Sequence, residues 1–567
     1  MTPTVQMCQK RSKFFLFFLY PIIFLGHLTR GCVRNFEEDP RVCLKSGPCF
    51  LGRWDTTDQG NRYATFQSIP YAQPPVGELR FKNPLPMQFV KGSMDVSSKE
   101  KVICTQRDML TNVLKGTEDC LVLSIHVPQS AFKLFRAGQF PVMVWIHGGA
   151  FVFGSGQDEE YGPEYFMDTQ DVILVTVNYR LGPLGFLSLG NEMVPGNAGL
   201  RDQNLALQWV QSNIAQFGGR PDKVTIFGES AGSYSCGMHI LSPMSRGLFK
   251  RAILQSKSPL GPSWMAISPK DALNHGESFK ERLQCDKVQD PLKCLQTQSI
   301  ENVLGKATLD ENFITWMPVP DAEFTIDPFL TQDPKSLLEN GEFPGDIEVI
   351  IGSTKDEGIL SVMEQILVPS KWKTLQDNFN PKLVKNMLNI ADNENATSDE
   401  IERALKVVEF YVGSIDNINQ ENLQSVTDMY TDATFLHGNY KTAEYFMKKG
   451  VKTYQYILTY VGEHSFSELF GIPVMGVGHA DDLQYLFNQK VKLNVKDTEV
   501  KDLMIEAWTN FASNGDPNGM KIGAKNVWET IDEGRKYWNI SGTQPTMEFS
   551  DEIRERMTFW DSIMNYA

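Results

Sequence analysis

Short segments rich in apolar residues recur along the middle of the chain. They predict strands at residues 121–127, 141–147, 171–178, 249–255, 348–352 and 453–460, and the segments at 141–147 and 171–178 are continuous apolar runs. Unbroken apolar runs of this length are typical of strands in a sheet that is covered on both faces. The pattern therefore predicts a central sheet whose middle strands are buried.

A different period is found between two of these runs, where apolar residues return every three or four positions. Residues 197–217 place five such side chains on one side of a helix: Leu200, Leu207, Val210, Ile214 and Phe217. Gly218 and Gly219 end this helix, and an apolar stretch at 223–227 follows at once. Strands that alternate with helices in this way predict an α/β fold with a doubly wound, mostly parallel sheet.

The segments around these strands are less regular. Residues 41–82 predict a β-hairpin and meander, whereas residues 260–345 and 360–450 are irregular and helical. We expect the two helical segments to cover the strand ends as a lid region. The sequence contains no internal repeat, low-complexity tract or linker, so a single elaborated domain over residues 32–567 is the simplest organisation.

The N-terminal residues have the pattern of a secretory signal peptide. Three basic residues within 10–13 precede an apolar stretch at 14–25, and cleavage fits after Gly26 or after Gly31. The apolar stretch is shorter than the ~20 residues that a membrane span needs. We therefore expect a signal peptide over residues 1–31 and an extracellular protein, with an uncleaved anchor as the alternative.

Composition agrees with a large secreted globular protein. The chain has 567 residues, of which 41% are hydrophobic, and a formal net charge of -15. An acidic balance argues against a nucleic-acid-binding surface, which would be basic. We therefore expect no nucleic-acid partner, and no stable membrane anchor once the signal peptide is removed.

Cysteine spacing also agrees with an oxidising compartment. Three pairs lie close in the sequence: Cys104 with Cys120, Cys285 with Cys294, and Cys43 with Cys49, which could bridge a hairpin. Each bridge would close a short loop and stabilise the fold by roughly 2–3 kcal/mol in the chain-entropy model. Cys236 is expected to be a buried free thiol, and Cys32 has no evident partner. Two glycosylation sequons begin at Asn395 and Asn539.

The first candidate for chemistry is Ser230, in the segment 223–233 with the sequence KVTIFGESAGS. Gly-x-Ser-x-Gly between a strand and a helix is the context of a nucleophile elbow. Gly228 and Gly232 remove side chains that would collide there, so that strand and helix can pack closely. The pattern alone is weak, because a chain of this length contains it by chance roughly 0.2 times.

A serine hydroxyl needs an adjacent base to become a nucleophile. Where this elbow occurs, the acid and then the base follow the serine along the chain. That order leaves three of the eight histidines: His437, His464 and His479. His479 is favoured, because flanking glycines let its loop bring the side chain close to the elbow.

The acid and the oxyanion donors are expected at the carboxyl ends of strands, where catalytic groups of open sheets gather. Asp356 and Glu357 both follow the strand at 348–352, and the chemistry of the two carboxyls leaves either open. The small residues 148–150 follow the strand at 141–147 and leave their backbone N–H groups unshielded. They are candidates to stabilise a developing oxyanion.

These segments together resemble the type-B carboxylesterases, the carboxylesterase/cholinesterase family, and are nearest to the arthropod carboxylesterases. The resemblance spans most of the mature chain: PYAQPPVGELRF (70–81), EDCLVL (118–123), VMVWIHGGAF (142–151), VNYRLGPLGFL (177–187), GNAGLRDQNLALQWVQSNIAQFGG (196–219), KVTIFGESAGS (223–233), GLFKRAILQS (247–256), GSTKDEG (352–358) and GVGHADDLQYLF (476–487). As a set these motifs are highly specific.

The resemblance implies an α/β-hydrolase fold with Ser230 as nucleophile, Glu357 as acid and His479 as base. It thereby selects Glu357 over Asp356. It implies three backbone donors to the oxyanion: Gly149, Ala150 and Ala231. It also implies two disulfides, Cys104–Cys120 and Cys285–Cys294, and a reaction without metal or cofactor.

The chain departs from the family pattern in three places. The loop between Cys104 and Cys120 holds no aromatic residue, whereas cholinesterases carry a choline-binding Trp there. Juvenile hormone esterases typically have Gln at the position of Glu229, and Lys257 stands where the family usually has Gly. Four apolar residues are candidates for an acyl pocket, although such residues are more often core: Leu260, Trp264, Phe313 and Trp316.

The sequence thus predicts a secreted serine hydrolase that cleaves small carboxylic esters through an acyl-enzyme. One alternative is an esterase that sequesters esters or organophosphates and turns over slowly, and another is a juvenile-hormone-type esterase. A non-catalytic adhesion protein on the same fold is disfavoured, since such relatives usually lose the serine and gain a transmembrane tail. The physiological ester and the oligomeric state stay open.

Overall fold

The computed structural model describes residues 39–133, 139–261, 266–307, 316–377, 397–519 and 527–564. The predicted signal peptide lies outside this part of the chain, as do four of the residues singled out above: Cys32, Trp264, Phe313 and Asn395. Residues 40–567 form one compact unit.

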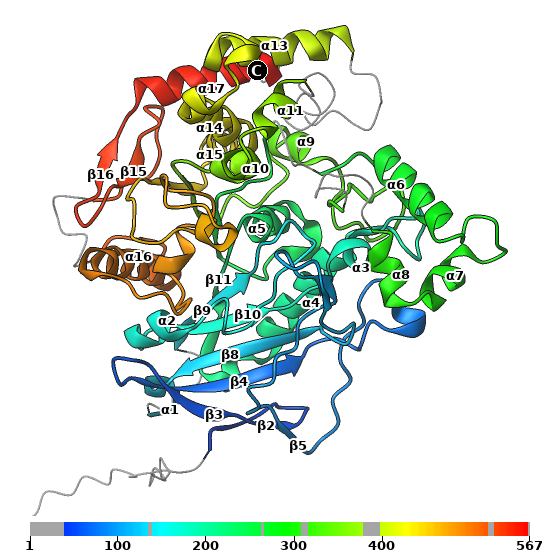
Figure 1. Cartoon of the computed structure of the whole chain (residues 1–567). Helices are drawn as coiled ribbons and strands as arrows, with labels where there is room; N and C mark the ends of the chain where they lie inside the picture. Colours follow the sequence, from blue (N-terminus) through cyan, green and yellow to red (C-terminus); the bar gives the residue numbers. More distant parts are fainter. Residues whose placement is uncertain are drawn as a thin grey trace, which may run out of the picture. The chain divides into compact units, whose positions relative to one another are not determined.

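An 11-stranded sheet runs through this unit (Figure 1). In spatial order its strands are β16 (Thr546–Glu548), β15 (Tyr537–Ile540), β14 (Lys452–Leu458), β13 (Glu348–Thr354), β12 (Arg251–Gln255), β11 (Gly219–Glu229), β9 (Phe140–Ile146), β10 (Ile173–Val177), β8 (Val122–Pro128), β4 (Arg62–Pro70) and β3 (Arg53–Thr56). The strands from β15 to β10 in this order run parallel, and the pairs beyond them are antiparallel. The predicted doubly wound, mostly parallel sheet is confirmed.

The apolar runs form the central strands because both of their faces are covered. All seven residues of β9 are buried. Successive side chains of a strand point to opposite faces, and accordingly Val142 and Val144 belong to one hydrophobic core whereas Met143 and Trp145 belong to another. A strand with one face exposed to solvent would instead have alternating apolar and polar residues.

Helices cover the two faces of the sheet. On one face α4 (Ala198–Asn213) and α5 (Ala231–Leu241) pack into the same core as Val142. On the other, α2 (Glu164–Thr169) and α16 (Val495–Asn514) pack with Trp145. The helix predicted at 197–217 is confirmed as α4 and a 3-10 turn, η2 (Ile214–Phe217), that continues it. Two short helices complete this part: α1 (Gln129–Lys133) and α3 (Gly182–Phe186).

The two segments predicted as irregular and helical contain helices separated by irregular stretches. Between β12 and β13 lie α6 (Pro269–Arg282), α7 (Pro291–Thr297), α8 (Ile300–Gly305) and α9 (Pro334–Glu339). Between β13 and β14 lie α10 (Ile359–Leu367), α11 (Lys371–Asp377), α13 (Ser398–Val412), α14 (Leu423–Thr431), a π-helical turn η7 (Asp432–Leu436) and α15 (His437–Lys448). This second group packs with the C-terminal helix α17 (Asp551–Met564) around a core of its own (Figure 1).

The N-terminal meander is built from short strands, as predicted. A small sheet contains β1 (Arg41–Cys43), β2 (Cys49–Leu51) and β5 (Ser93–Asp95), and a two-stranded ribbon pairs β6 (Gln106–Arg107) with β7 (Leu114–Lys115). All three expected disulfides are present: Cys43–Cys49, Cys104–Cys120 and Cys285–Cys294. Cys236 is a buried free thiol on α5, as expected. None of the described helices is both long and apolar enough to cross a bilayer.

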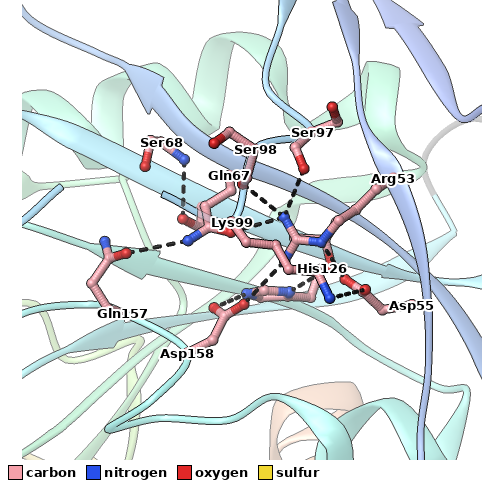
Figure 2. Close-up of polar contacts among 12 residues, drawn as sticks. Arg53, Asp55, Gln67, Ser68, Ser97, Ser98, Lys99, His126, Gln157 and Asp158 are labelled. Carbon is pink, nitrogen blue, oxygen red and sulfur yellow. Dashed lines mark hydrogen bonds and ion pairs between the residues drawn. The ribbon is translucent and has the colours of Figure 1, made fainter. Parts of the chain in front are cut away.

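A buried polar network crosses the antiparallel end of the sheet (Figure 2). His126 on β8 has no exposed surface, and its Nε2 lies 3.3 Å from Oδ1 of Asp158. Its Nδ1 lies 3.3 Å from the hydroxyl of Thr65 on β4. Arg53 on β3 donates to Asp158 at 3.4 Å and to Gln67 at 2.8 Å. The network therefore ties the last three strands at this end of the sheet, β8, β4 and β3, to the segment after β9.

Candidate active site

Ser230 occupies the sharp turn between β11 and α5. Its φ of 57° and ψ of -122° lie outside the regions that ordinary residues favour, which is the strain expected of a nucleophile elbow. A Cβ atom added to Gly232 would lie 1.9 Å from the carbonyl oxygen of Ile146, and one added to Gly228 would lie 2.5 Å from the same oxygen. Both glycines are therefore needed for the close packing that the sequence predicted.

His479 and Glu357 are hydrogen-bonded to one another inside the protein. The Nδ1 atom of His479 lies 2.6 Å from Oε2 of Glu357, which has no exposed surface. The other carboxylate oxygen of Glu357 accepts a hydrogen bond of 2.8 Å from the backbone N–H of Thr354 at the end of β13. The carboxylate is thus fixed from both sides and can hold the imidazole in one orientation.

The neighbouring acid, Asp356, has a different place. One of its oxygens accepts a 3.0 Å hydrogen bond from the backbone N–H of Val477, and the other accepts one of 3.0 Å from the side chain of Gln424. Asp356 therefore fastens the loop that carries His479 instead of contacting the imidazole.

The other two candidate histidines pair with carboxylates of their own. The Nε2 atom of His437 lies 2.9 Å from Asp561 on α17, and the Nδ1 atom of His464 lies 3.3 Å from Glu468 one helical turn away. Of the three candidates, His479 is the one that the structure brings to Glu357 and to the residue before Ser230.

That preceding residue, Glu229, is a part of the site that the sequence did not reveal. It is buried, and its Oε1 lies 3.0 Å from Nε2 of His479. Burial favours the neutral imidazole, but the two carboxylates of Glu229 and Glu357 outweigh burial and raise the pKa of His479 well above its ordinary value. Its position at the last residue of a buried strand was the available signal.

The loop of His479 is held by a second buried acid. Asp481 accepts hydrogen bonds from the backbone N–H groups of Gly478 at 2.7 Å and Phe466 at 2.7 Å. Burial raises the pKa of Asp481 to about 7. From the other side the ring of Phe435, on η7, packs against the imidazole with 4.7 Å between ring centroids. These contacts fix the position of His479 by packing as well as by hydrogen bonds.

The glycine loop after β9 lies against the elbow. A Cβ atom added to Gly148 would lie 3.2 Å from the Cβ of Ser230. Gly149 and Ala150 both have positive φ, 99° and 51°, which turns the chain sharply here. Within the described residues, the N–H groups of Gly149, Ala150 and Ala231 donate no hydrogen bond to another group. The three N–H groups named as oxyanion donors are therefore available.

The acyl-pocket candidates are less clearly placed. Leu260 has no exposed surface and Trp316 is 4% exposed, and both belong to the large hydrophobic core. The indole of Trp316 packs edge-on against Phe279. Trp264 and Phe313 lie outside the described residues. A role for these four side chains in the acyl pocket stays a prediction.

One of the two sequons can be placed. Asn539 is on β15, is 9% exposed, and its side-chain oxygen accepts a 2.5 Å hydrogen bond from Thr459. The folded strand therefore directs this amide into the protein, which does not favour a glycan there. Asn395 lies outside the described residues.

Comparison with known proteins gives a consistent result. The family model described as "Carboxylesterase family" matches residues 38–560. The juvenile hormone esterase of Tribolium castaneum is 36% identical over 92% of this chain and 93% of its own. Venom carboxylesterase-6 of Apis mellifera is 34% identical over 96% of this chain and 97% of its own.

The fold is likewise similar to that of a solved structure. The crystal structure of juvenile hormone esterase from Manduca sexta, with OTFP covalently attached, superposes with a TM-score of 0.80 at 32% identity. The match covers 93% of this chain and 100% of the other.

Proposed function

The chain belongs to the carboxylesterase family and is a carboxylic-ester hydrolase, and we propose that it cleaves its substrate through Ser230, His479 and Glu357. The observation that carries this proposal is the buried 2.6 Å contact between His479 and Glu357, together with the 3.0 Å contact of the same imidazole with Glu229, the residue before the strained serine. A hydroxyl at an elbow, an imidazole and a fixed carboxylate are the parts that serine hydrolysis needs.

In the proposed mechanism, His479 takes the proton of Ser230 as the hydroxyl oxygen attacks the ester carbonyl. Glu357 keeps the proton of the imidazole on Nδ1 and stabilises the imidazolium that forms. The N–H groups of Gly149, Ala150 and Ala231 donate to the tetrahedral oxyanion, and the loss of one such donor typically costs about 3 kcal/mol. The alcohol leaves, and water repeats the sequence on the acyl-enzyme.

A test compares two hydroxyls of the same chain. Ser230→Ala is expected to lower kcat on short-chain p-nitrophenyl esters by at least about 10⁴-fold, as the loss of a serine nucleophile does in other hydrolases. Thr65→Val removes a hydroxyl that also lies beside an imidazole, that of His126, but at the far end of the sheet. It should leave kcat within about twofold. Wild-type turnover by the Ser230→Ala protein would refute the nucleophile assignment.

We further propose that the protein is secreted, with residues 1–31 as signal peptide and 32–567 as one catalytic domain. The three disulfides support this proposal, because such bonds persist in oxidising compartments. N-terminal sequencing of the protein from culture medium tests it. A first residue near 27 or 32 is expected, and an intact N-terminus held in the membrane fraction would contradict it.

A second candidate is hydrolysis of juvenile hormone, the ester in the names of the Tribolium and Manduca relatives. Against it stands Glu229, where such esterases typically carry Gln. Turnover should be measured on esters in which acyl length and alcohol vary separately, with juvenile hormone as one member. A kcat/KM for juvenile hormone at least about tenfold above every other ester would establish this narrower function.

Slow turnover after rapid acylation is the remaining alternative. It predicts a burst of one alcohol per enzyme followed by a much slower steady rate. Linear release of many equivalents from the first seconds would exclude a sequestering role.

A further inference from the structure

Lys257 lies at the centre of the site although it carries none of the assigned roles. It follows β12 by one turn residue, Ser256, whose φ is 68°. Strand β12 pairs on one side with the elbow strand β11 and on the other with β13, which leads to Glu357. The end of β12 therefore lies between the nucleophile and the acid. The Lys257 side chain is 4% exposed, which is rare for a lysine.

The contacts of Lys257 lead to His479. Its Nζ donates a 2.6 Å hydrogen bond to the carbonyl oxygen of Thr434, within the π-helical turn η7. The same Nζ lies 5.9 Å from the ring centroid of Phe435, whose other neighbour is the His479 imidazole. The carbonyl oxygen of Lys257 accepts a hydrogen bond from the hydroxyl of Ser233 on α5. One residue thus joins the elbow helix to the turn behind the base.

The charges around the site are otherwise mostly negative. His479 faces Glu229 at the end of β11 and Glu357 after β13. Three further acids hold its loop or follow it: Asp356, Asp481 and Asp482. Glu357 is a charged group that acts on Lys257. Burial lowers the pKa of the lysine to about 7, while Glu357 acts to raise it.

We propose that Lys257 is a positioning residue for ester hydrolysis, whose buried ammonium offsets the Glu357 carboxylate and holds η7 against His479. The proposal rests on the triad assigned above. Two carboxylates beside an imidazole favour its protonated form, which cannot accept the serine proton. A nearby positive charge opposes the second proton on the ring, so His479 becomes a free base at a lower pH than it otherwise would.

The test is the pH profile of kcat/KM for a neutral p-nitrophenyl ester. Lys257→Gln removes the charge but keeps an N–H donor for Thr434, and Lys257→Met removes both. The acid limb is the rise of activity with pH as the base loses its proton. In each variant it should move upward by about one pH unit, because one nearby positive charge is lost. Only Lys257→Met should also lower kcat on the plateau, by about tenfold or less, because η7 loses its tie.

A matched control is Lys441→Met. Lys441 is also 4% exposed, and its ammonium lies 3.3 Å from Glu444 and 3.5 Å from Asp561, which pairs with His437 instead of His479. Its loss should lower the melting temperature and leave the acid limb in place. An acid limb that is unchanged in Lys257→Gln, or equally shifted in Lys441→Met, would overturn the proposal.

Two further measurements keep the outcomes separate. If Ser230→Ala retains activity, the triad itself is wrong; if it is inactive and the Lys257 variants keep the wild-type profile, the role of Lys257 alone is wrong. Should neither Lys257 variant fold, the wild-type profile decides. If Lys257 and His479 interact and titrate in the same pH range, the acid limb spans a wider pH range than the loss of a single proton would. An acid limb that fits one independent proton would refute the coupling.

Discussion

The chain contains two trios of hydroxyl, imidazole and carboxylate, each built around a buried histidine. One is Ser230, His479 and Glu357; the other is Thr65, His126 and Asp158. The two histidines are almost equally hidden, at 7% and 0% exposed. Yet only the first trio lies at the carboxyl ends of parallel strands, where catalytic groups of open sheets gather.

The difference lies in the backbone around each imidazole. His126 is in the middle of β8, so ladder hydrogen bonds fix its backbone and neighbouring strands close both sides. Its partner carboxylate, Asp158, accepts a hydrogen bond from Arg53 within a network that joins β3, β4 and β8 (Figure 2). His479 is on a loop and contacts Glu229, the residue before a strained serine. The three N–H groups near that serine have no hydrogen-bond acceptor among the described residues. The strained serine and the N–H groups, and not the histidine–carboxylate pair alone, are why we propose catalysis at the first trio.

The largest expected effect comes from replacing each of the two histidines in turn. His479→Asn should lower kcat by about 10⁵- to 10⁶-fold, because no group is left to take the serine proton. His126→Asn should keep kcat within about threefold but lower the free energy of unfolding by about 1–3 kcal/mol, the cost of a disturbed buried polar contact. Steady-state kinetics and thermal melts check both. A large loss of kcat in His126→Asn would remove the distinction between the trios.

Substitution of the carboxylate in each trio is expected to have the next largest effect. Glu357→Gln should lower kcat by about 10⁴-fold, since the imidazole loses the partner that fixes its tautomer. Asp158→Asn should leave kcat unchanged within about threefold and alter the pH dependence of stability instead. Burial opposes the charge of Asp158, but His126 and Arg53 outweigh burial and lower its pKa.

The sign for Asp158 follows from that shift. A carboxyl whose pKa is lower in the folded state contributes stability above its unfolded pKa, near 4, and that stability is lost as pH falls. Wild type should therefore lose more stability between pH 5 and pH 3 than Asp158→Asn does. Urea unfolding at the two pH values measures this, and parallel losses in the two proteins would show that the Asp158 pair contributes nothing.

The smallest expected effect is a shift of the acid limb in the pH profile of kcat/KM. Glu229 raises the pKa of His479, so Glu229→Gln should let the imidazole lose its proton at lower pH. The acid limb of kcat/KM should move downward by about one pH unit, opposite to the Lys257 variants. Asp158→Asn, with its charge beside His126, should leave the limb in place. A downward shift in that variant as well would mean that the two sites are electrostatically coupled.

Local patterns in the sequence predicted much of this protein correctly. Apolar runs predicted β9, β10 and β13, because a strand that is covered on both faces has no solvent-exposed face with polar side chains. Gly228 and Gly232 predicted the elbow, since close packing there excludes a side chain. The three disulfides join cysteines at separations of 6, 16 and 9 residues, short enough to be recognised as pairs. Each of these features depends on residues near one another in the chain.

Only the tertiary structure shows which contacts each charged side chain makes. The chemistry of Asp356 and Glu357 left either open and a family resemblance selected Glu357, whereas the fold shows one bound to a loop backbone and the other to an imidazole 122 residues further on. Glu229 and Lys257 looked like departures from a family pattern, and folding placed one against His479 and the other between Glu357 and η7. The electrostatic field at an imidazole depends on distances between side chains on different strands. A local sequence pattern does not determine those distances.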